Sequence, residues 1–540
     1  MKSIFQKEKG LVKKENNKTI APWVITAVAA LLIFGILFVR SRPGVADQGD
    51  FIRVMASAGL NYTEADFANW SEVYYTKVIE EYSIDSGWSF GSLLRPQTTM
   101  LFPVIAVRTV CKIFNVNFST TYLAALLSFT LLLLTYYVFR AIYARLGGFA
   151  YVIALMTFLV LLSGPYLVWF NSLYQEGSVY LGYLLFLGSS LLAAFKKEKK
   201  GLRYLVPVFL SATFLLGLKP QLISALPIVL IVIACLVISK IPTEKKRRAF
   251  YFGSSFVLVC LMIAGCLYAY GVNRKGLGKA TTYHSVFFGI LNPAMSTDPQ
   301  SDLIELGLDP SLAVDAGKTA YESEDSYFCP PGSQMAQDMI FSKVSTAKVA
   351  LFYVKNPDKL LHMLNYTAEN SYSTKSMFMK NMGEDADNAI VSYKWRLWDT
   401  LRMKIGPNTF LSYAVQYLLF FAVSLLIYIW RVKKGSVARW VIGLYWVNLL
   451  IGMLQYPLPF LGNGMADTTK QLFLFILSYD IAVLSSILFI LYWLYRRFSG
   501  PLANLFNKSK DASESDFAAL KERFETSENK GKTEEIRDKI

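Results

Sequence analysis

The feature that most constrains this chain is a series of long apolar stretches, each of about the length that an α-helix needs to cross a lipid bilayer. Ten such stretches are present, and nearly all of them lack a charged side chain. They span Pro22–Val39, Thr120–Phe139, Phe149–Trp169, Ser178–Phe195, Tyr204–Gly217, Leu222–Ser239, Phe250–Tyr270, Phe410–Trp430, Trp440–Leu454 and Gln471–Leu494. Because a backbone in lipid must satisfy its own hydrogen bonds, we predict an all-α polytopic membrane protein with about ten transmembrane helices.

The composition supports this prediction. Of 540 residues, 54% are hydrophobic and only 17% are charged, whereas soluble domains carry roughly 25% charged residues. An ordinary soluble enzyme and a disordered chain are therefore excluded. The net charge of +16 would suggest a nucleic acid partner in a soluble protein. Here the basic residues lie beside the apolar stretches, so we expect membrane lipid and no nucleic acid as the partner.

Basic residues gather in alternate loops, which is the pattern of loops that face the cytoplasm. They are Lys2, Lys7, Lys9, Lys13, Lys14 and Lys18 before the first stretch, Arg140 and Arg145 after the second, Lys196, Lys197, Lys199, Lys200 and Arg203 after the fourth, Lys240, Lys245, Lys246, Arg247 and Arg248 after the sixth, Arg431, Lys433, Lys434 and Arg439 after the eighth, and Arg496 and Arg497 after the tenth. We therefore expect a multi-pass membrane protein with both termini in the cytoplasm.

This topology divides the chain into five parts. We predict a basic cytoplasmic arm at 1–21, a bundle of seven spans at 22–270, a mixed or mainly helical extracytoplasmic domain at 271–409, three further spans at 410–495 and a charged cytoplasmic tail at 496–540. The bundle includes a first extracytoplasmic loop at 41–118. In the domain, Asp309-Pro310 and Asn356-Pro357 predict helix starts. Cys111 and Cys329 both lie outside in this topology, and their spacing does not decide whether they pair.

Two segments leave alternatives open. Tyr204–Gly217 and Leu222–Ser239 are joined by only four residues, so they form either a tilted hairpin or a re-entrant pair. Gln97–Phe114 is apolar, but Pro103, Arg108 and Lys112 interrupt it. We expect it to be an amphipathic helix on the outer membrane surface and not a span.

The strongest candidate for chemistry is a pair of carboxylates directly after the first span. Asp47 and Asp50 lie three residues apart with Gly49 between them, and Arg53 follows one helical turn later. Such a pair could act as a general base or hold a divalent metal such as Mg²⁺ or Mn²⁺. The alternative is structural: Asp50 would cap a helix by accepting backbone N–H bonds, and Asp47 would be solvated.

Several charged residues in other outside loops could join this pair. Lys219, Lys470, Arg53 and Arg95 could bring positive charge to the pair, although a lysine at a helix end can also extend to water, and Lys470 could pair with Asp467. Glu176 is the only charge in its loop and could bind a ligand hydroxyl, pair with Lys219 or support the aspartates. His284 follows the seventh span closely and could line the site. No nucleotide-binding loop is present in the sequence.

The first loop carries the segment Ala46-Asp47-Gln48-Gly49-Asp50-Phe51-Ile52-Arg53. This segment resembles the run A-D-N-G-D-F/Y-x-R of the WsfD-type glycan biosynthesis hexose transferases of Firmicutes. That group belongs to the type C (GT-C) glycosyltransferases. Segments 170–177, 218–221 and 464–470 are similar to later loops of that group. Gln48 replaces an expected asparagine, and Gln471 stands where a histidine is expected. These departures bear on donor or acceptor preference.

The resemblance implies an inverting hexosyltransferase with a polyprenyl-phosphate sugar donor and an extracytoplasmic glycan or lipid-linked acceptor. It implies that Asp47 or Asp50 is the catalytic carboxylate. The substrate-binding candidates are Arg53, Glu176, Lys219, Gln221, Asp467, Lys470, Arg95 and His284. Among them, the basic residues Lys219, Lys470, Arg53 and Arg95 would neutralise the donor phosphate, and Glu176 could bind a sugar hydroxyl. A flippase or exporter of lipid-linked oligosaccharides and a non-catalytic scaffold of an envelope glycan complex are the alternatives.

Overall fold

The computed structural model describes residues 20–39, 42–64, 66, 77–89, 91–92, 96–196, 201–374, 379–382, 395–433 and 436–498. The predicted basic arm up to Lys18, Arg95 and the tail from residue 499 lie outside these ranges. Residues 1–484 form one compact unit, and residues 485–540 form a second, of which the structure describes the end of one helix. The chain is an all-α polytopic membrane protein with short strands in its connecting segments.

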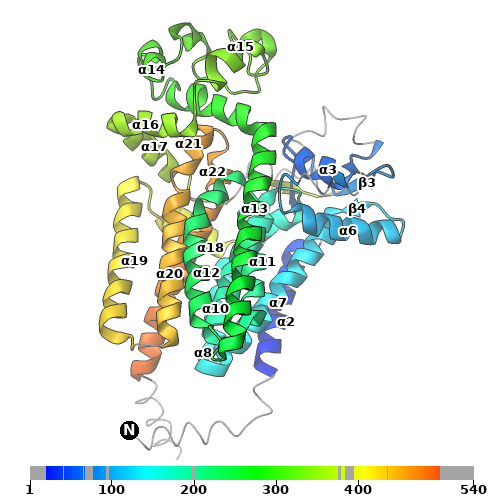
Figure 1. Cartoon of the computed structure of the whole chain (residues 1–540), viewed down its shortest axis with the longest axis vertical. Coiled ribbons are helices and arrows are strands. Elements are labelled where there is room, and N and C mark those ends of the chain that lie inside the picture. The colour runs from blue at the N-terminus through cyan, green and yellow to red at the C-terminus, as the bar shows by residue number, and fades with distance from the viewer. Residues whose placement is uncertain are drawn as a thin grey trace, which may run out of the picture. The chain divides into compact units, whose positions relative to one another are not determined.

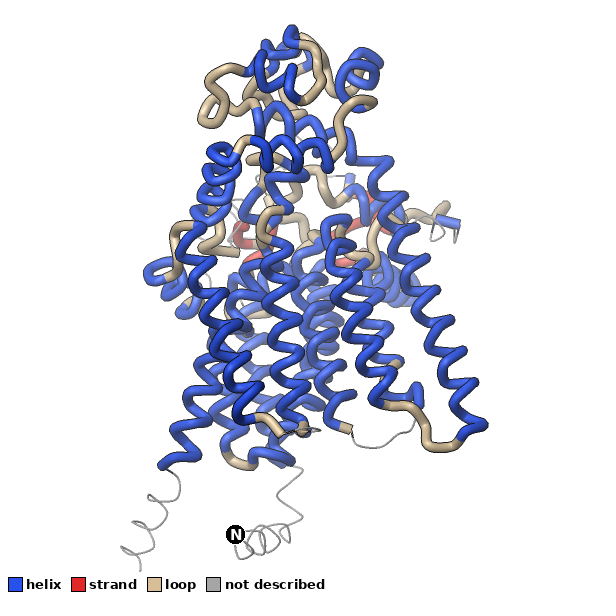
Figure 2. Tube along the Cα trace, turned by 60° about the vertical axis from the view of Figure 1, so that its left-hand side comes forward, coloured by secondary structure: helices blue, strands red, loops and turns tan. Residues whose placement is uncertain are grey.

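Within the described residues, eight helices are long and apolar enough to cross a membrane. They are α2 (Ile20–Leu37), α7 (Thr120–Leu146), α10 (Gln175–Phe195), η5 with α12 (Pro220–Ser239), the apolar part of α13 (Arg247–Val272), α19 (Phe410–Arg431), α20 with α21 (Val437–Asn463) and the last helix (Phe473–Phe498). Figures 1 and 2 show those within the first unit arranged as a bundle. Eight of the ten predicted spans are thus confirmed by length and composition.

The other two predicted spans differ from straight helices. The third is broken into α8 (Phe149–Leu161) and a segment made of α9 (Gly164–Leu167) and η3 (Val168–Asn171), with a bend of 62° between them. Ser163 and Pro165 lie at this break, and a proline favours the start of a new helix. The fifth predicted span is the shorter apolar helix Leu202–Leu216, composed of η4 (Gly201–Tyr204) and α11 (Val206–Leu216).

The segment between α2 and α7 forms a small lobe at one end of the bundle (Figure 1). It contains α3 (Ile52–Ala58), α6 (Leu101–Ile113) and a three-stranded antiparallel sheet of β2 (Leu60–Asn61), β3 (Glu81–Ile84) and β4 (Phe118–Ser119). At 13 residues, α6 is about 20 Å long and too short to cross the bilayer. It buries Val104, Val107 and Cys111 and exposes Phe102 and Ile113, as predicted for an amphipathic helix.

The segment after the seventh span is mainly helical, as predicted. Helix α13 (Lys245–Tyr283) continues beyond its apolar part and passes into the π-helical turn η6 (His284–Ile290), so the predicted boundary at residue 271 falls inside a helix. Next come α14 (Pro299–Glu305), η7 (Pro310–Asp315), η8 (Glu324–Ser326), α15 (Gln334–Ala336), η9 (Gln337–Phe341), α16 (Thr346–Lys355), α17 (Pro357–Glu369), β5 (Met379–Asn381) and α18 (Leu397–Ile405). The predicted helix starts at Pro310 and Pro357 are confirmed.

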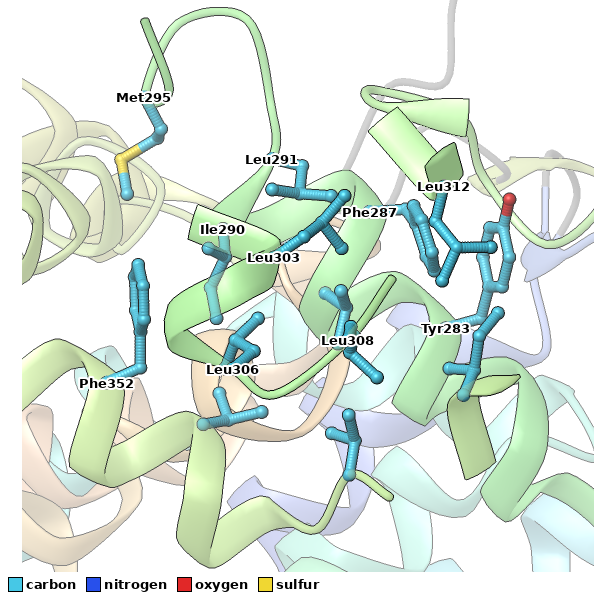
Figure 3. Packing of buried hydrophobic residues seen from close by; sticks show 14 of the residues in the cluster. Tyr283, Phe287, Ile290, Leu291, Met295, Leu303, Leu306, Leu308, Leu312 and Phe352 are labelled. Atoms are coloured by element: carbon cyan, nitrogen blue, oxygen red, sulfur yellow. The ribbon is translucent and has the colours of Figure 1, made fainter. Parts of the chain in front are cut away.

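A hydrophobic core joins this helical segment to the bundle. Figure 3 shows Phe287 and Ile290 of η6 packed with Leu303 of α14 and with Leu306, which directly follows α14. Phe460 of α21 (Leu458–Asn463) belongs to the same core. The loop after α21 lies very close to η6. A Cβ added to Gly464 in this loop would lie 2.3 Å from the carbonyl oxygen of His284, so only glycine fits there. Cys111 and Cys329 are both buried free thiols, so they do not pair.

Candidate active site

The two aspartates after α2 have different environments. Gly49 between them has φ of 96°, in the left-handed region that favours glycine. The side chain of Asp47 is buried, and its Oδ1 accepts the N–H groups of Gly49 at 2.8 Å and Phe51 at 3.2 Å. Its Oδ2 accepts the hydroxyl of Tyr62. Asp47 therefore holds the turn that leads into α3, and the alternative in which Asp50 caps the helix and Asp47 is solvated is wrong.

Asp50 instead lies between two cations. Its Oδ1 is 2.5 Å from Nη2 of Arg53, one helical turn along α3, and its Oδ2 is 2.7 Å from Nζ of Lys470. The Asp50 side chain remains 28% exposed, whereas that of Lys470 is only 7% exposed. The carboxylate is therefore both paired and accessible, which distinguishes it from the enclosed carboxylate of Asp47.

Lys470 reaches the first loop from α22 (Thr468–Gln471), just before the last helix. Its Nζ also lies 3.4 Å from Oδ2 of Asp467, which in turn accepts a hydrogen bond of 3.4 Å from Nε2 of Gln48. Asp467 has φ of 51°, a conformation that Asp tolerates better than most residues. The ammonium of Lys470 stands 4.9 Å from the ring centroid of Tyr174.

Glu176 and Lys219 form a second ion pair beside the first. Glu176 lies in the first turn of α10 and Lys219 directly precedes η5 (Pro220–Ala225). Nζ of Lys219 is 2.5 Å from Oε1 of Glu176, whose side chain is 1% exposed. Among the described residues no group donates a hydrogen bond to Oε2 of Glu176. Of the alternatives that the sequence left open for Glu176, the pair with Lys219 is present in the structure.

The electrostatics of the two pairs are linked. Burial raises the pKa of Asp50, but the charges of Lys470, Arg53 and, further away, Lys219 outweigh it and hold the pKa well below its usual range. Burial lowers the pKa of Lys470, and the carboxylates of Asp50, Asp467 and Glu176 raise it above its ordinary value. Burial raises the pKa of Asp47 despite its three hydrogen bonds. Asp50 and Lys470 are therefore both charged at neutral pH.

The bent segment η3 positions the first loop. Asn171 donates from Nδ2 to the carbonyl oxygens of Leu37 at 3.3 Å and Pro43 at 3.0 Å. Pro43 begins β1 (Pro43–Val45), which pairs antiparallel with β5. Tyr174 follows η3, and its hydroxyl accepts the N–H of Gln48 at 3.1 Å. The break in the third predicted span thus supplies the contacts that fix the aspartate turn.

The described residues contain no group of three His, Cys, Asp or Glu side chains that could hold a metal ion. Lys470 contacts both Asp50 and Asp467, so its ammonium occupies the space between the two accessible carboxylates. A divalent metal shared by these carboxylates would have to displace Lys470. The arrangement found is therefore an ion-pair network and not a preformed metal site.

The chain was compared with models of known protein families. Residues 7–511 match the family model of the YfdI N-terminal transmembrane domain. The chain belongs to this family. Searches of curated proteins and of solved structures each gave no match. The narrower resemblance to WsfD-type hexose transferases stays a prediction.

In this YfdI-family chain, the remaining predicted site residues fall in three places. Gln221 donates from Nε2 to the carbonyl oxygen of Gln471 at 3.1 Å and so connects η5 with α22 beside the ion pairs. His284 is buried and does not contact the ion pairs directly. Its Nε2 accepts the N–H of Ala320 at 2.8 Å, and its Nδ1 is 2.9 Å from Oδ1 of Asn463. Both ring nitrogens are thus engaged by protein groups. Arg95 lies outside the described residues.

Three tyrosines were not among the predicted site residues. Tyr62 and Tyr174 bind the aspartate turn through their hydroxyl groups. Partial burial raises the pKa of Tyr321, and the nearby charges of the site also act on it. Tyr321 belongs to the helical segment after α13 and is exposed. Tyr174 lies in the segment 170–177 that carries part of the family resemblance, but nothing in the sequence singles out Tyr62 or Tyr321, because tyrosines are also frequent in interfacial belts.

Proposed function

We propose that this chain is an integral membrane glycosyltransferase that transfers a hexose, with inversion, from a polyprenyl-phosphate donor to an extracytoplasmic glycan or lipid-linked acceptor. The observation that carries the proposal is the accessible Asp50 carboxylate held between Arg53 and Lys470. Such a group can take a proton, and the two cations can neutralise a phosphate. Membership of the YfdI N-terminal transmembrane domain family fits the resemblance to GT-C enzymes.

In the proposed reaction, the Asp50 carboxylate takes the proton of an acceptor hydroxyl. The acceptor oxygen forms a bond to the anomeric carbon of the hexose from the side opposite the phosphate. The bond between that carbon and the phosphate oxygen breaks, and the polyprenyl phosphate leaves with the bonding electron pair. A single displacement of this kind inverts the anomeric configuration. Asp47 is less suited to this role, because three hydrogen bonds already occupy its buried oxygens.

The ion pairs also connect donor binding to the strength of the base. While Arg53 and Lys470 contact Asp50, its low pKa makes it a weak base. A phosphate that attracts these cations weakens their hold on Asp50, which raises the pKa of the carboxyl group. Asp467 keeps Lys470 near the site during this exchange. Asp50 thus becomes a better base when the donor is present.

We propose that the site faces the outside of a bacterial cell and that both termini are cytoplasmic. The ion pairs and the helical segment lie at one end of the bundle, as Figure 1 shows for α3, α22 and α16. At the other end, Arg145 donates to the carbonyl oxygen of Phe195 at 2.8 Å, so two of the basic loops meet there. The excess of basic loops marks the cytoplasmic side. A periplasmic or surface-exposed reporter fused after Phe195 that proved active would contradict this orientation.

The experiment that tests the proposed function is transfer of radiolabelled hexose from polyprenyl-phosphate donors in membranes that contain the full chain. Transfer that requires the Asp50 carboxylate would support it. If no member of a hexose donor panel is consumed, the proposal fails.

A further inference from the structure

An exposed aromatic side chain in the helical segment after α13 is held near the candidate active site. Tyr321 lies between η7 and η8, in a loop of residues 316–328 that we call the tyrosine loop. Its side chain is 72% exposed. A single exposed ring is ordinary on a protein surface, but the backbone that carries this one is fixed by contacts on both sides.

These contacts come from the residues directly before and after the tyrosine. On one side, the N–H of Ala320 donates to Nε2 of His284 at 2.8 Å. On the other side, the N–H of Glu322 donates to the hydroxyl of Tyr327 at 2.6 Å. The rings of Tyr321 and His284 also meet edge to face, with 5.2 Å between their centroids. The exposed ring is therefore preorganised, so binding a ligand costs it little further freedom.

His284 joins the tyrosine loop to the turn before Asp467. Because Nε2 of His284 accepts an N–H group, Nδ1 carries the proton of the neutral ring and donates to Oδ1 of Asn463 at 2.9 Å. Nδ2 of Asn463 donates in turn to the carbonyl oxygen of Ala466 at 2.9 Å. Partial burial raises the pKa of Tyr321, and the charges of the ion-pair network act on it as well. A continuous series of contacts thus connects the tyrosine loop with that network.

The charges near Tyr321 have the opposite sign to those that pair with Asp50. Lys470 and Arg53 place cations beside Asp50, whereas residues 298–329 carry eight Asp or Glu and only one Lys or Arg. The three carboxylates that follow the tyrosine most closely are exposed, namely those of Glu322, Glu324 and Asp325. Cations attract a phosphate, while carboxylates accept hydrogen bonds from sugar hydroxyl groups and repel a polyanion.

The tyrosine loop belongs to the part of the protein beyond the end of the bundle. Figure 1 shows α14 and α15, which precede and follow this loop in the chain, at that place. A donor carried by a membrane lipid reaches the site from the bilayer. The loop is instead placed to meet the substrate that arrives from the aqueous side.

We propose that the tyrosine loop binds the acceptor as a neutral saccharide, with the Tyr321 ring against one face of a pyranose ring. The C–H groups on that face are apolar and pack against an aromatic ring, while the exposed carboxylates of the loop accept hydrogen bonds from the sugar hydroxyl groups. The inference rests on the proposed transferase function, and it adds the chemical class of the acceptor. The same carboxylates select against a polyanionic acceptor.

The test is binding of the full-length protein in lipid nanodiscs to an array of immobilised oligosaccharides. Neutral saccharides on the array are matched with polymers that carry phosphodiester or carboxylate groups. No donor is present, so binding requires no turnover. We expect the wild type to bind at least one neutral saccharide, and Tyr321→Ala to weaken that binding about tenfold, because one aromatic contact is lost. Tyr321→Phe and Tyr321→Trp keep a ring and should retain most of the binding.

The matched control is Tyr122→Ala, the same change at an exposed tyrosine in the first turn of α7, which should bind as the wild type does. Neutralising the loop with Glu322→Gln, Glu324→Gln and Asp325→Asn together should admit anionic polymers that the wild type rejects. A wild type that binds no neutral saccharide would overturn the proposal. Equal binding by Tyr321→Ala and wild type, or a wild type that prefers the anionic polymers, would overturn it too.

The two proposals fail in different ways. A wild-type protein that binds a neutral saccharide through Tyr321 but transfers no hexose from any donor contradicts the transferase function and not the saccharide site. A wild-type protein that transfers hexose, with an unchanged KM for the acceptor in Tyr321→Ala, contradicts the saccharide site and not the transferase function.

Discussion

Nζ of Lys470 lies 2.7 Å from Oδ2 of Asp50, although 420 positions separate the two residues in the chain. The contact joins the turn after the first span to the short helix before the last one. The candidate site is therefore complete only when both ends of the transmembrane chain have folded together.

Removing the charge of Lys470 should impair transfer. In Lys470→Met, kcat/KM for the lipid donor should fall by about 10²–10³-fold, because one cation that faces the leaving phosphate is lost. Steady-state kinetics in membranes measure this fall. The matched control is Lys359→Met, which breaks a comparable Lys–Asp pair of 2.5 Å in the helical segment. If both variants transfer hexose like the wild type, Lys470 does not act on the donor.

Removing the charge of Arg53 should shift the pH dependence. Lys470 and Arg53 hold the pKa of Asp50 below its ordinary value of 3.8, so the carboxylate stays charged as the pH falls through the weakly acidic range. In Arg53→Gln the pKa rises, Asp50 becomes protonated at a higher pH, and the acidic limb of kcat/KM should move upward.

The control for this shift is Arg42→Gln. Arg42 pairs with Glu80 at 2.8 Å in the same lobe but does not contact Asp50, so its loss should leave the acidic limb in place. An identical limb in Arg53→Gln and wild type would show that the measured limb belongs to a different group.

A buried network outside the site should govern stability. Arg402 of α18 contacts Asp480 of the last helix, and its Nη2 lies 2.6 Å from Oδ1 of Asp399; all three side chains are almost fully buried. Tyr166 donates to Asp480 at 2.6 Å. Arg402→Met leaves both carboxylates without their cation and should lower the free energy of unfolding by about 3–5 kcal/mol.

Thermal unfolding in detergent measures this change. Arg247→Met, which breaks an exposed pair with Glu244, should leave Tm unchanged, because exposed pairs contribute little. An equal Tm for Arg402→Met and wild type would mean that the network contributes no stability.

His284 should make stability depend on pH. Burial lowers its pKa from the ordinary value of 6.5, so the unfolded chain binds more protons than the folded one as the pH falls below that value. Stability should therefore decrease on acidification and recover above pH 6.5. His284→Gln should flatten this dependence in Tm measured across the same range. A steeper dependence in the variant would contradict the assignment of the effect to His284.

Much of the architecture could be predicted from the sequence, because apolar length and basic loops are local signals. The turn at Gly49 and the pair Asp50–Arg53 could be predicted from the glycine and from helical spacing, and the pairs Lys470–Asp467 and Lys219–Glu176 were among the alternatives that the sequence left open. Residues that are costly to bury near lipid tend to find partners among the few charges available.

Other features could not be predicted, because they depend on tertiary contacts. The sequence does not tell which aspartate is enclosed: burial by Tyr62 and the following backbone decides that Asp47 holds the turn. Nor does it show that α13 continues to Tyr283 or that Arg402 reaches Asp480 in the last helix. Each of these arrangements depends on packing between segments that are far apart in the chain.

The role of Asp50 as the base is tested most directly by measuring hexose transfer from a polyprenyl-phosphate donor. The membranes contain wild type, Asp50→Asn or Asp47→Asn at matched abundance, and each is assayed with and without EDTA. We predict that Asp50→Asn lowers transfer by about 10²–10⁴-fold, while Asp47→Asn acts mainly by lowering the folded fraction of the protein. A loss of transfer in EDTA would show that a divalent metal takes part. Unchanged transfer by Asp50→Asn would contradict the central claim that its carboxylate is the base.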